Sequence, residues 1–303
     1  MIDFQKLDLS QREQYQEYLM HCGERGCEYS LANLYMWGHQ KVAIVHNCMA
    51  FYSQYERSSV YPFPIGDGDI GAVLDAIIHD AGVRGLECRF VAMTAEDCAL
   101  LEERYPGKFT FHPDRTYSDY IYAIENLANL PGRKYQRKRN HLNRFRQNHP
   151  DCVLVEITPE LLSDVKAMAE IWYAGRMAST LDSDFHLEKR ALCRALENWE
   201  ALCLEGAVLL ENGKVLAMSI GSLLSEDTFD VHFEKALEDV DGAYAAINQA
   251  FSAHLHKKYP HLRWLNREDD LGLEGLRKAK LSYYPDRLVV KFWASLKEDD
   301  DED

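Results

Sequence analysis

The heptapeptides GAVLDAI (71–77) and GAYAAIN (242–248) share their opening Gly-Ala and their apolar spacing, and each begins an amphipathic helix. The features that follow the two helices recur in one order. Each helix leads to a strand, then Glu-Asp, a second helix and Tyr-Pro; the dipeptides are Glu96-Asp97 with Tyr105-Pro106, and Glu268-Asp269 with Tyr284-Pro285. Because the order holds as well as the single matches, the sequence predicts two structurally related halves.

Strands and helices alternate along both halves, which predicts an α/β fold in which each half is a mixed twisted sheet flanked by helices. Asn47 and Asn212-Gly213 predict the turns of two hairpins. The runs FTFH (109–112) and YSDYIYAI (117–124) are expected to form two separate strands.

Pro131-Gly132 interrupts the pattern and marks the expected domain boundary. We expect an N-terminal domain at 1–130, a C-terminal domain at 131–296 and an acidic, disordered tail at 297–303.

Charge and cysteine usage limit the classes of function. The net charge of −15 argues against general binding to nucleic acid or anionic lipid, because both would be repelled. The eight cysteines are scattered, as in a reducing cytosol. His21-Cys22-x4-Cys27 lacks a second pair at zinc-ligand spacing, so we predict no metal. The sequence shows neither a signal-peptide pattern nor an apolar run of about 20 residues; we therefore expect a cytoplasmic protein without a membrane span.

The two halves differ in their chemical equipment. Residues 266–270 read Asn-Arg-Glu-Asp-Asp, whereas the matching residues 94–98 read Thr-Ala-Glu-Asp-Cys. The helix that follows in the second half also carries Arg277 and Lys278, which its counterpart lacks. A site for an anionic group is therefore predicted in the C-terminal half, with the N-terminal half as support.

Three long strings resemble the phosphatidylglycerol lysyltransferase C-terminal-domain family: DYIYAIENLANLPGRKYQRKRNHLNRF (119–145), FEKALEDVDGAYAAINQAF (233–251) and LNREDDLGLEGLRKAKLSYYPDRLVVKF (265–292). The resemblance implies two tandem acetyltransferase-like (GNAT) domains, an arrangement also used by Fem-type aminoacyl-tRNA-dependent transferases. It further implies an acyl donor, either aminoacyl-tRNA or acyl-CoA.

The helix that starts at Gly242 is a candidate phosphate site, because its first N–H groups are unpaired and glycine lets a phosphate approach. Ala243, Tyr244 and Asn248 would line it. The alternative is an ordinary helix start capped by Asp241. Aspartates in this loop would repel the pyrophosphate of coenzyme A, which favours an aminoacyl donor.

The polar residues after the next strand offer groups of both signs. Asn266 is expected to face the acyl donor, or else to stabilise a turn. Arg267, Glu268 and Asp269 together suit a zwitterion such as an amino acid. The alternative is that the two acids only stabilise the N-terminus of the helix that follows. We expect Arg267 to lie in one cleft with Glu234 and other predicted site residues: Tyr244, Asn266, Glu268 and Arg277.

Glu234 is our candidate for the base that takes a proton from the attacking amine. The alternative is a solvated polar strand face, since Asp230 and His232 alternate with it. Tyr283 and Tyr284 are candidates for the leaving-group proton, or else core or interface aromatics.

The segment RKYQRKRNHLNRFR (133–146) holds seven Lys or Arg and no acid. Arg133, Arg137 and Arg144 form one helical stripe with Lys138 beside it, and this stripe is suited to the acceptor stem of a tRNA or to a lipid headgroup. The alternative is a surface helix joined to the acidic halves by ion pairs.

Three functions follow from these patterns. The leading one is an acyltransferase that acts on an amine or hydroxyl, with an aminoacyl group favoured over an acetyl group. The second is a non-catalytic sensor of an amino acid or nucleotide. The third is a peripheral enzyme at the inner membrane surface that modifies phospholipid headgroups.

Overall fold

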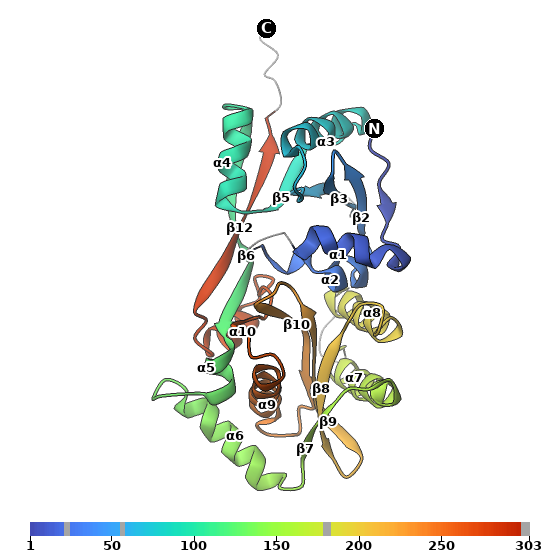
Figure 1. Cartoon of the computed structure of the whole chain (residues 1–303). Coiled ribbons are helices and arrows are strands. Elements are labelled where there is room, and N and C mark those ends of the chain that lie inside the picture. Colours follow the sequence, from blue (N-terminus) through green and yellow to red (C-terminus); the bar gives the residue numbers. More distant parts are fainter. Residues whose placement is uncertain (21–24, 55–57, 178–182, 298–303) are drawn as a thin grey trace. The chain divides into compact units, whose positions relative to one another are not determined.

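The computed structural model describes residues 1–20, 25–54, 58–177 and 183–297. It divides into two compact units (Figure 1). Unit one contains Met1–Asp119, Asp269–Glu274 and the chain from Leu288 onward; unit two contains Tyr120–Glu268 and Gly275–Arg287. The expected tail at 297–303, apart from Lys297, and the pair His21-Cys22 lie outside the described residues.

Among the described residues, the sheet of unit one contains seven strands, one of which, β12, comes from near the C-terminal end of the chain. Their spatial order is β1 (Gln5–Lys6), β2 (Gln40–Val45), β3 (Cys48–Gln54), β4 (Ser59–Pro62), β5 (Arg89–Met93), β12 (Arg287–Leu296) and β6 (Phe109–Ala123). The pairs up to β3/β4 are antiparallel, β4/β5 is parallel and β5/β12 is antiparallel.

Unit two repeats this pattern. Its spatial order is β7 (Val153–Glu156), β8 (Glu205–Glu211), β9 (Lys214–Leu223), β10 (Thr228–Ala236), β11 (Trp264–Asn266) and the last residues of β6. The pairs up to β9/β10 are antiparallel, β10/β11 is parallel and β11/β6 is antiparallel. The same order and directions in both units are what a structural duplication requires.

The helices also recur between corresponding strands. In unit one these are α1 (Arg12–Met20) and α2 (Leu31–Met36) after β1, α3 (Ile70–Arg84) after β4, and α4 (Ala95–Arg104) after β5. Their counterparts are α7 (Leu162–Met177), α8 (Ser183–Glu197), α9 (Ala243–Lys258) and α10 (Glu274–Leu281). Helices α5 (Ile124–Asn129) and α6 (Gln136–Asn148) follow β6, and short 3₁₀ turns occupy Leu9–Gln11, Cys27–Tyr29 and Pro159–Leu161.

Strand β3 shows how alternation builds the core of unit one. Cys48, Ala50 and Tyr52 face the apolar cluster formed with α3, whereas Met49 and Phe51 face the cluster formed with α1 and α2. Because successive side chains of a strand point to opposite faces, both faces of β3 are covered. In unit two, α7 and α8 lie on one side of the sheet and α9 on the other (Figure 1).

Local signals account for several element boundaries. The Thr94 hydroxyl accepts from the N–H of Asp97 and the Asp97 carboxylate accepts from the N–H of Thr94, which fixes the start of α4. The hairpins turn where they were predicted, with positive φ at Asn47, Asn212 and Gly213.

The prediction of two strands at 109–112 and 117–124 is wrong, because Phe109–Ala123 is the single strand β6. Pro113 interrupted the pattern. It fits inside β6 because only Ile121–Ala123 pair with β11, so along Pro113 the strand is at the edge of the unit-one sheet, where a missing N–H costs little.

No described helix is both long and apolar enough to cross a membrane.

Candidate functional site

The candidate site of unit two lies where two parallel strands separate. β10 and β11 pair only from Thr228–Asp230 to Trp264–Asn266, and β10 then continues to Ala236. A register shift between Val231 and Phe233 bends β10 at this point. The polar side chains beyond the last pair therefore flank a wedge between the strands, with those from β10 on one side and those that follow β11 on the other.

An ion pair joins Glu234 on β10 to Arg267 after β11. Arg267 Nη2 donates to Glu234 Oε1 over 2.8 Å, and the two side chains are only 13% and 11% exposed. Asn248 on α9 donates from Nδ2 to the other carboxylate oxygen over 3.0 Å. Glu234 is thus held from two sides, by Arg267, with which it was expected to share a cleft, and by Asn248, which was expected at the helix-start site.

Aromatic rings and a lysine surround this pair. The guanidinium carbon of Arg267 lies 4.9 Å from the ring centroid of Tyr283 and 5.6 Å from that of Tyr122. The ammonium of Lys138 on α6 lies 3.6 Å from the centroid of Tyr283. Tyr283 therefore has two cations against its ring, and both contacts are stabilised by the ring quadrupole.

Burial shifts the titration of these groups. Desolvation, with the nearby charge of Arg267, lowers the pKa of Lys138 to about 8. Burial raises the pKa of Tyr283, which therefore keeps its proton near neutral pH. Burial alone would lower the pKa of Arg267, but the charge of Glu234 and the neighbouring tyrosines leave it above the usual value. Lys138 is thus the cation of this cluster with a pKa nearest to neutrality.

Three buried polar atoms in this region have no hydrogen-bond partner among the described residues: Arg267 Nη1, Asn248 Oδ1 and the hydroxyl of Ser219. Ser219 is paired with Glu234 across β9 and β10, so its side chain lies on the same face of the sheet. Buried polar atoms are usually satisfied, and these supply a donor, an acceptor and a hydroxyl to a small polar ligand.

The wedge also contains a second cluster, the Asp230–His232–Glu268 triad. His232 Nδ1 lies 3.1 Å from Glu268 Oε1 and 3.5 Å from Asp230 Oδ2. His232 Nε2 lies 2.8 Å from the Ser222 hydroxyl. Among the described residues of unit two, the ligand atoms of Asp230, His232 and Glu268 are close enough to share an ion.

Other predicted residues have structural contacts. Asn266 is buried, and its Oδ1 accepts from the N–H of Glu268 over 2.7 Å, which is the turn-stabilising arrangement. Asp269 likewise accepts from the N–H of Leu271. The hydroxyl of Tyr244 accepts from the Trp172 indole over 2.9 Å. On α10, Arg277 is half-buried and Lys278 is exposed. Tyr284 is 44% exposed and lies against Tyr135.

The start of α9 differs from expectation. Gly242 itself is the N-cap residue, with φ of 82°, and no side chain caps the helix. Asp241 is therefore not the cap; it accepts from Arg144 over 2.7 Å. A Cβ at Gly242 would lie 2.4 Å from the carbonyl oxygen of His141 on α6. The glycine is required because α6 packs against it, with the buried Ala243 beside it.

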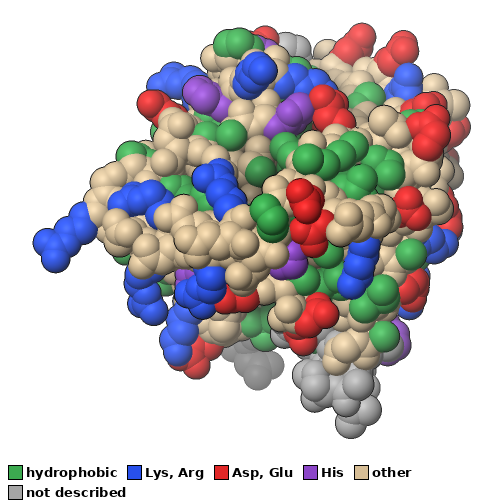
Figure 2. All heavy atoms as spheres, turned by 90° about the horizontal axis from the view of Figure 1, so that it is seen from below, with side chains coloured by type: hydrophobic (Ala, Val, Ile, Leu, Met, Phe, Trp, Pro, Cys, Tyr) green, Lys and Arg blue, Asp and Glu red, His purple; other side chains and the backbone are tan. Residues whose placement is uncertain are grey.

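The basic segment is arranged differently from the predicted stripe. Helix α6 begins at Gln136, so Arg133 precedes it. Arg137 is exposed and Arg144 pairs with Asp241, whereas Lys138 is directed to Tyr283. Figure 2 shows Lys and Arg side chains gathered on the side of the lower face where Figure 1 places α6.

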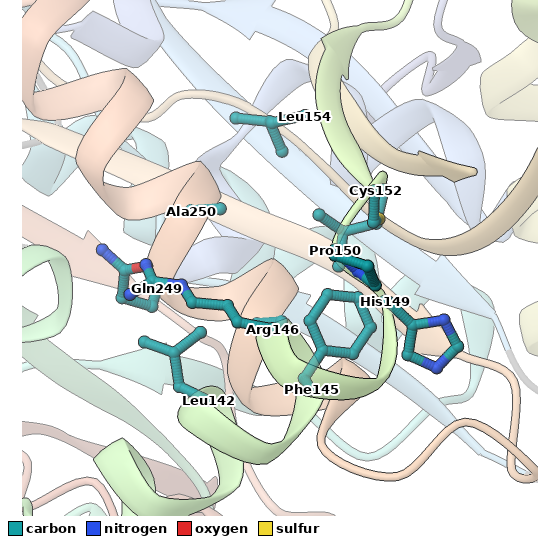
Figure 3. A pocket seen from close by; sticks show the side chains of 11 residues that line it. Leu142, Phe145, Arg146, His149, Pro150, Cys152, Leu154, Gln249 and Ala250 are labelled. Atoms are coloured by element: carbon teal, nitrogen blue, oxygen red, sulfur yellow. The ribbon is translucent and has the colours of Figure 1, made fainter.

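The structure also contains a cavity of about 220 Å³ between α6, α9 and the neighbouring strands (Figure 3). Apolar side chains such as Leu142, Phe145 and Leu154 line it, with Arg146 and Gln249 at its edge. Neither Glu234 nor Arg267 lines this cavity. It is therefore separate from the polar wedge.

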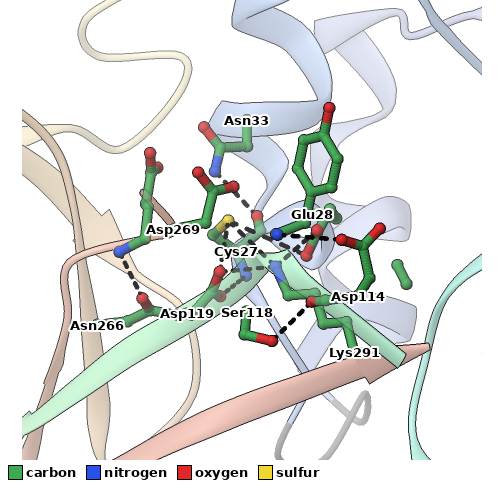
Figure 4. A network of polar contacts seen from close by, with 12 residues as sticks. Cys27, Glu28, Asn33, Asp114, Ser118, Asp119, Asn266, Asp269 and Lys291 are labelled. Atoms are coloured by element: carbon green, nitrogen blue, oxygen red, sulfur yellow. Dashed lines mark hydrogen bonds and ion pairs between the residues drawn. The ribbon is translucent and has the colours of Figure 1, made fainter. Parts of the chain in front are cut away.

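Unit one contains a buried polar cluster that the sequence analysis missed (Figure 4). Lys291 Nζ lies 2.6 Å from both Asp119 Oδ1 and Glu28 Oε1, and 3.8 Å from the Cys27 sulfur. The Cys27 N–H also donates to Asp119 over 2.7 Å. Cys27 and Glu28 are neighbours, but Asp119 and Lys291 lie 92 and 264 positions from Cys27, and no local spacing signals the cluster.

Comparison with known proteins identifies the family. A family model described as phosphatidylglycerol lysyltransferase, C-terminal, matches residues 21–295. The chain belongs to this family. The family resemblance drawn from the sequence is thereby confirmed. An uncharacterised relative from Mycoplasmoides gallisepticum is 25% identical over 178 residues, which are 58% of this chain and 55% of that protein. The chain thus spans about half the length of this relative.

Several solved structures resemble the chain. A conserved protein of unknown function from Bacteroides thetaiotaomicron has a TM-score of 0.92 at 38% identity, covering 98% of this chain and 100% of that one. L-PGS from Bacillus licheniformis has a TM-score of 0.69 at 16% identity, covering 97% and 93%.

FemX (TM-score 0.63, covering 98% of each chain) and a tandem GNAT protein of clavulanic acid biosynthesis (0.52, covering 99% and 100%) are each 9% identical to the chain. These distant likenesses show the fold, which is a pair of acetyltransferase-like domains.

Proposed function

We propose that unit two transfers an acyl group, and specifically an aminoacyl group, to an amine or hydroxyl acceptor in the wedge between β10 and β11. The observation that carries this proposal is the buried Glu234–Arg267 pair with Lys138 beside it. It combines a carboxylate that accepts protons with two cations that stabilise negative charge, as acyl transfer needs. Family membership supports the same class of reaction.

In the proposed reaction the acceptor attacks the carbonyl carbon of the aminoacyl ester and loses its proton to Glu234. The oxyanion that develops is stabilised by Arg267 Nη1, which has no protein partner among the described residues, and by the ammonium of Lys138. The ester C–O bond then breaks. The leaving hydroxyl takes its proton from Lys138, whose pKa of about 8 suits this role better than the raised pKa of Tyr283.

The packing of α6 favours an aminoacyl donor over acyl-CoA. The N-terminus of a helix is where this type of fold would bind a pyrophosphate. Here the backbone of α6 covers Gly242, and the carboxylate of Asp241 lies next to it. Two exposed basic residues, Arg133 before α6 and Arg137 on α6, are then available to the acceptor stem of a tRNA.

A transfer assay tests the proposal. The chain is incubated with tRNA charged with labelled amino acids, or with labelled acetyl-CoA, together with amine or hydroxyl acceptors that include phosphatidylglycerol vesicles. We expect label to leave the tRNA only in the presence of an acceptor, Glu234→Gln to abolish transfer, and Lys166→Gln at an exposed position of α7 to retain it. Transfer from acetyl-CoA alone would refute the aminoacyl donor.

The sensor function predicts a different outcome. An amino acid or nucleotide would stabilise the fold in a thermal-shift screen, by about 2.7 kcal/mol at roughly 100 times its dissociation constant, without any turnover. Glu234→Gln, assayed after circular dichroism shows that it is folded, separates the two functions, because an enzyme loses turnover while it retains ligand. Sedimentation with anionic liposomes at low and high salt tests action on phospholipid headgroups.

A further inference from the structure

We propose that the Asp230–His232–Glu268 triad of unit two is a binding site for one divalent transition-metal ion, with zinc as the best fit. The inference does not depend on acyl transfer. It rests on the arrangement of three ligand-type side chains whose donor atoms converge on one point in the wedge.

The separations of the donor atoms match those around zinc. Ligand atoms bound tetrahedrally at about 2.1 Å from zinc are roughly 3.4 Å apart. His232 Nδ1 lies 3.1 Å from Glu268 Oε1 and 3.5 Å from Asp230 Oδ2. The third separation, between the two carboxylate oxygens, is within 4.8 Å. An ion bound to the three atoms would have a further coordination position for a water or substrate atom.

The other ring nitrogen of His232 is held as in metal sites. A histidine that binds a metal through one nitrogen usually donates a hydrogen bond from the other, which fixes the ring orientation. His232 Nε2 lies 2.8 Å from the hydroxyl of the buried Ser222. The ring is thereby oriented with Nδ1 toward both carboxylates.

The backbone holds Glu268 in a strained conformation. Its φ of 55° is unusual for a residue other than glycine. The conformation is fixed from two sides, because the Glu268 N–H donates to Asn266 Oδ1 over 2.7 Å and its carbonyl accepts from the N–H of Tyr120 over 3.1 Å. Such strain collects at functional sites.

Burial makes the carboxylate charges costly without a cation. The side chains of Asp230 and His232 are 0% and 1% exposed, and that of Glu268 is 20% exposed, which leaves an entry path. A divalent ion neutralises both carboxylates at once.

In unit one, the charges of buried carboxylates are neutralised by a side chain and not by a metal ion. There the ammonium of Lys291 lies between Asp119 and Glu28, at 2.6 Å from each, and supplies the cation itself (Figure 4). In unit two the third group of the triad is an imidazole, which is a metal ligand.

Titration with metal alone tests the proposal. The full chain is dialysed against EDTA and then titrated with Zn²⁺ by calorimetry, and Co²⁺ is bound in parallel for its absorption spectrum. We expect one ion per chain, and a Co²⁺ spectrum without the near-ultraviolet band of a thiolate ligand. His232→Asn should abolish binding, and Ser222→Ala should weaken it by about 10- to 100-fold.

Two variants serve as controls, and a third protects against misfolding. His254→Asn changes a histidine on α9 that lies 3.4 Å from Glu156, and should bind zinc as the wild type does. Cys27→Ser removes the thiol of the unit-one cluster and should also bind normally. If His232→Asn fails to fold by circular dichroism, Glu268→Gln at the more exposed ligand takes its place. Absence of binding to the wild type, binding unchanged in both triad variants, or binding lost in Cys27→Ser would each overturn the proposal.

Discussion

Glu234 and Arg267 form a buried ion pair across the wedge between β10 and β11, with Arg267 Nη2 donating to Glu234 Oε1 over 2.8 Å. The two residues are 33 positions apart in the sequence. They meet because both strands end their mutual pairing at Asp230 and Asn266. The pair is therefore a consequence of sheet topology, and it is the feature on which stability and proposed chemistry both depend.

Replacing Glu234 by glutamine should destabilise unit two markedly. The change leaves the Arg267 guanidinium buried without its counter-charge, and breaking a buried pair costs about 3–5 kcal/mol. Urea denaturation measures the loss. The matched control is Glu170→Gln on α7, whose pair with Lys189 is exposed and should cost less than about 1 kcal/mol. Equal losses in the two variants would show that the Glu234–Arg267 pair is not effectively buried.

Lys138 should titrate near pH 8 in the folded protein, because burial and Arg267 disfavour its ammonium form. Between about pH 8 and the ordinary lysine value the unfolded chain then binds more protons, so this group makes stability rise with pH in that window. NMR of ¹³C-methylated lysines measures the titration, with exposed Lys278 as the reference. Glu234→Gln should lower the Lys138 pKa further, because the carboxylate supports the ammonium; an increase would contradict this account.

Gly242→Ala should cost about 3 kcal/mol, since it combines a positive φ with a close approach. The new Cβ would lie 2.4 Å from the His141 carbonyl, which is backbone and cannot turn away. Gly132→Ala is the control, because Gly132 also has positive φ, at 71°, but no atom lies within 4 Å of its ideal Cβ. It should lose only about 1 kcal/mol in the same unfolding experiment. If the two variants are equally stable, α6 does not press on the start of α9.

Lys291→Met should destabilise unit one by about 3–5 kcal/mol, because it leaves Asp119 and Glu28 together in a buried site. The double variant Asp119→Asn with Lys291→Met should recover part of that loss, and a double-mutant cycle from thermal unfolding gives the coupling. The pKa of Lys291 is raised, so its stabilising effect is complete through neutral pH and is lost only as pH rises through that raised value. Additive losses in the cycle would contradict a direct interaction.

The local part of the fold could be predicted from the sequence. The Thr94 cap, the Asn212-Gly213 turn and the amphipathic helices depend on residues that are neighbours in the chain. The duplication was visible for the same reason, because each repeated feature is local and only their order is long-range. The separation of 109–112 from 117–124 was predicted wrongly, because Pro113 is a strong local signal whose effect depends on the strand next to it.

Only part of the candidate site could be predicted from the sequence. The proximity of Glu234 and Arg267 followed from two adjacent strand ends, which alternation and helix starts place at one edge of a sheet. Lys138 was interpreted as a surface cation, since basic residues at helical spacing give no indication of which one turns inward. The triad was missed because Asp230 and His232 resemble a solvated strand face until Glu268 and Ser222 are placed against them.

The sequence by itself determined most of the helices and strands and their duplicated order, because these depend on spacing along the chain. Only the tertiary structure decided that β12 completes the sheet of unit one and that the end of β6 completes the sheet of unit two. It also decided which charges are buried together. Both depend on strand pairing between distant segments, and such pairing is selected by the burial of whole faces, which no short stretch of sequence encodes.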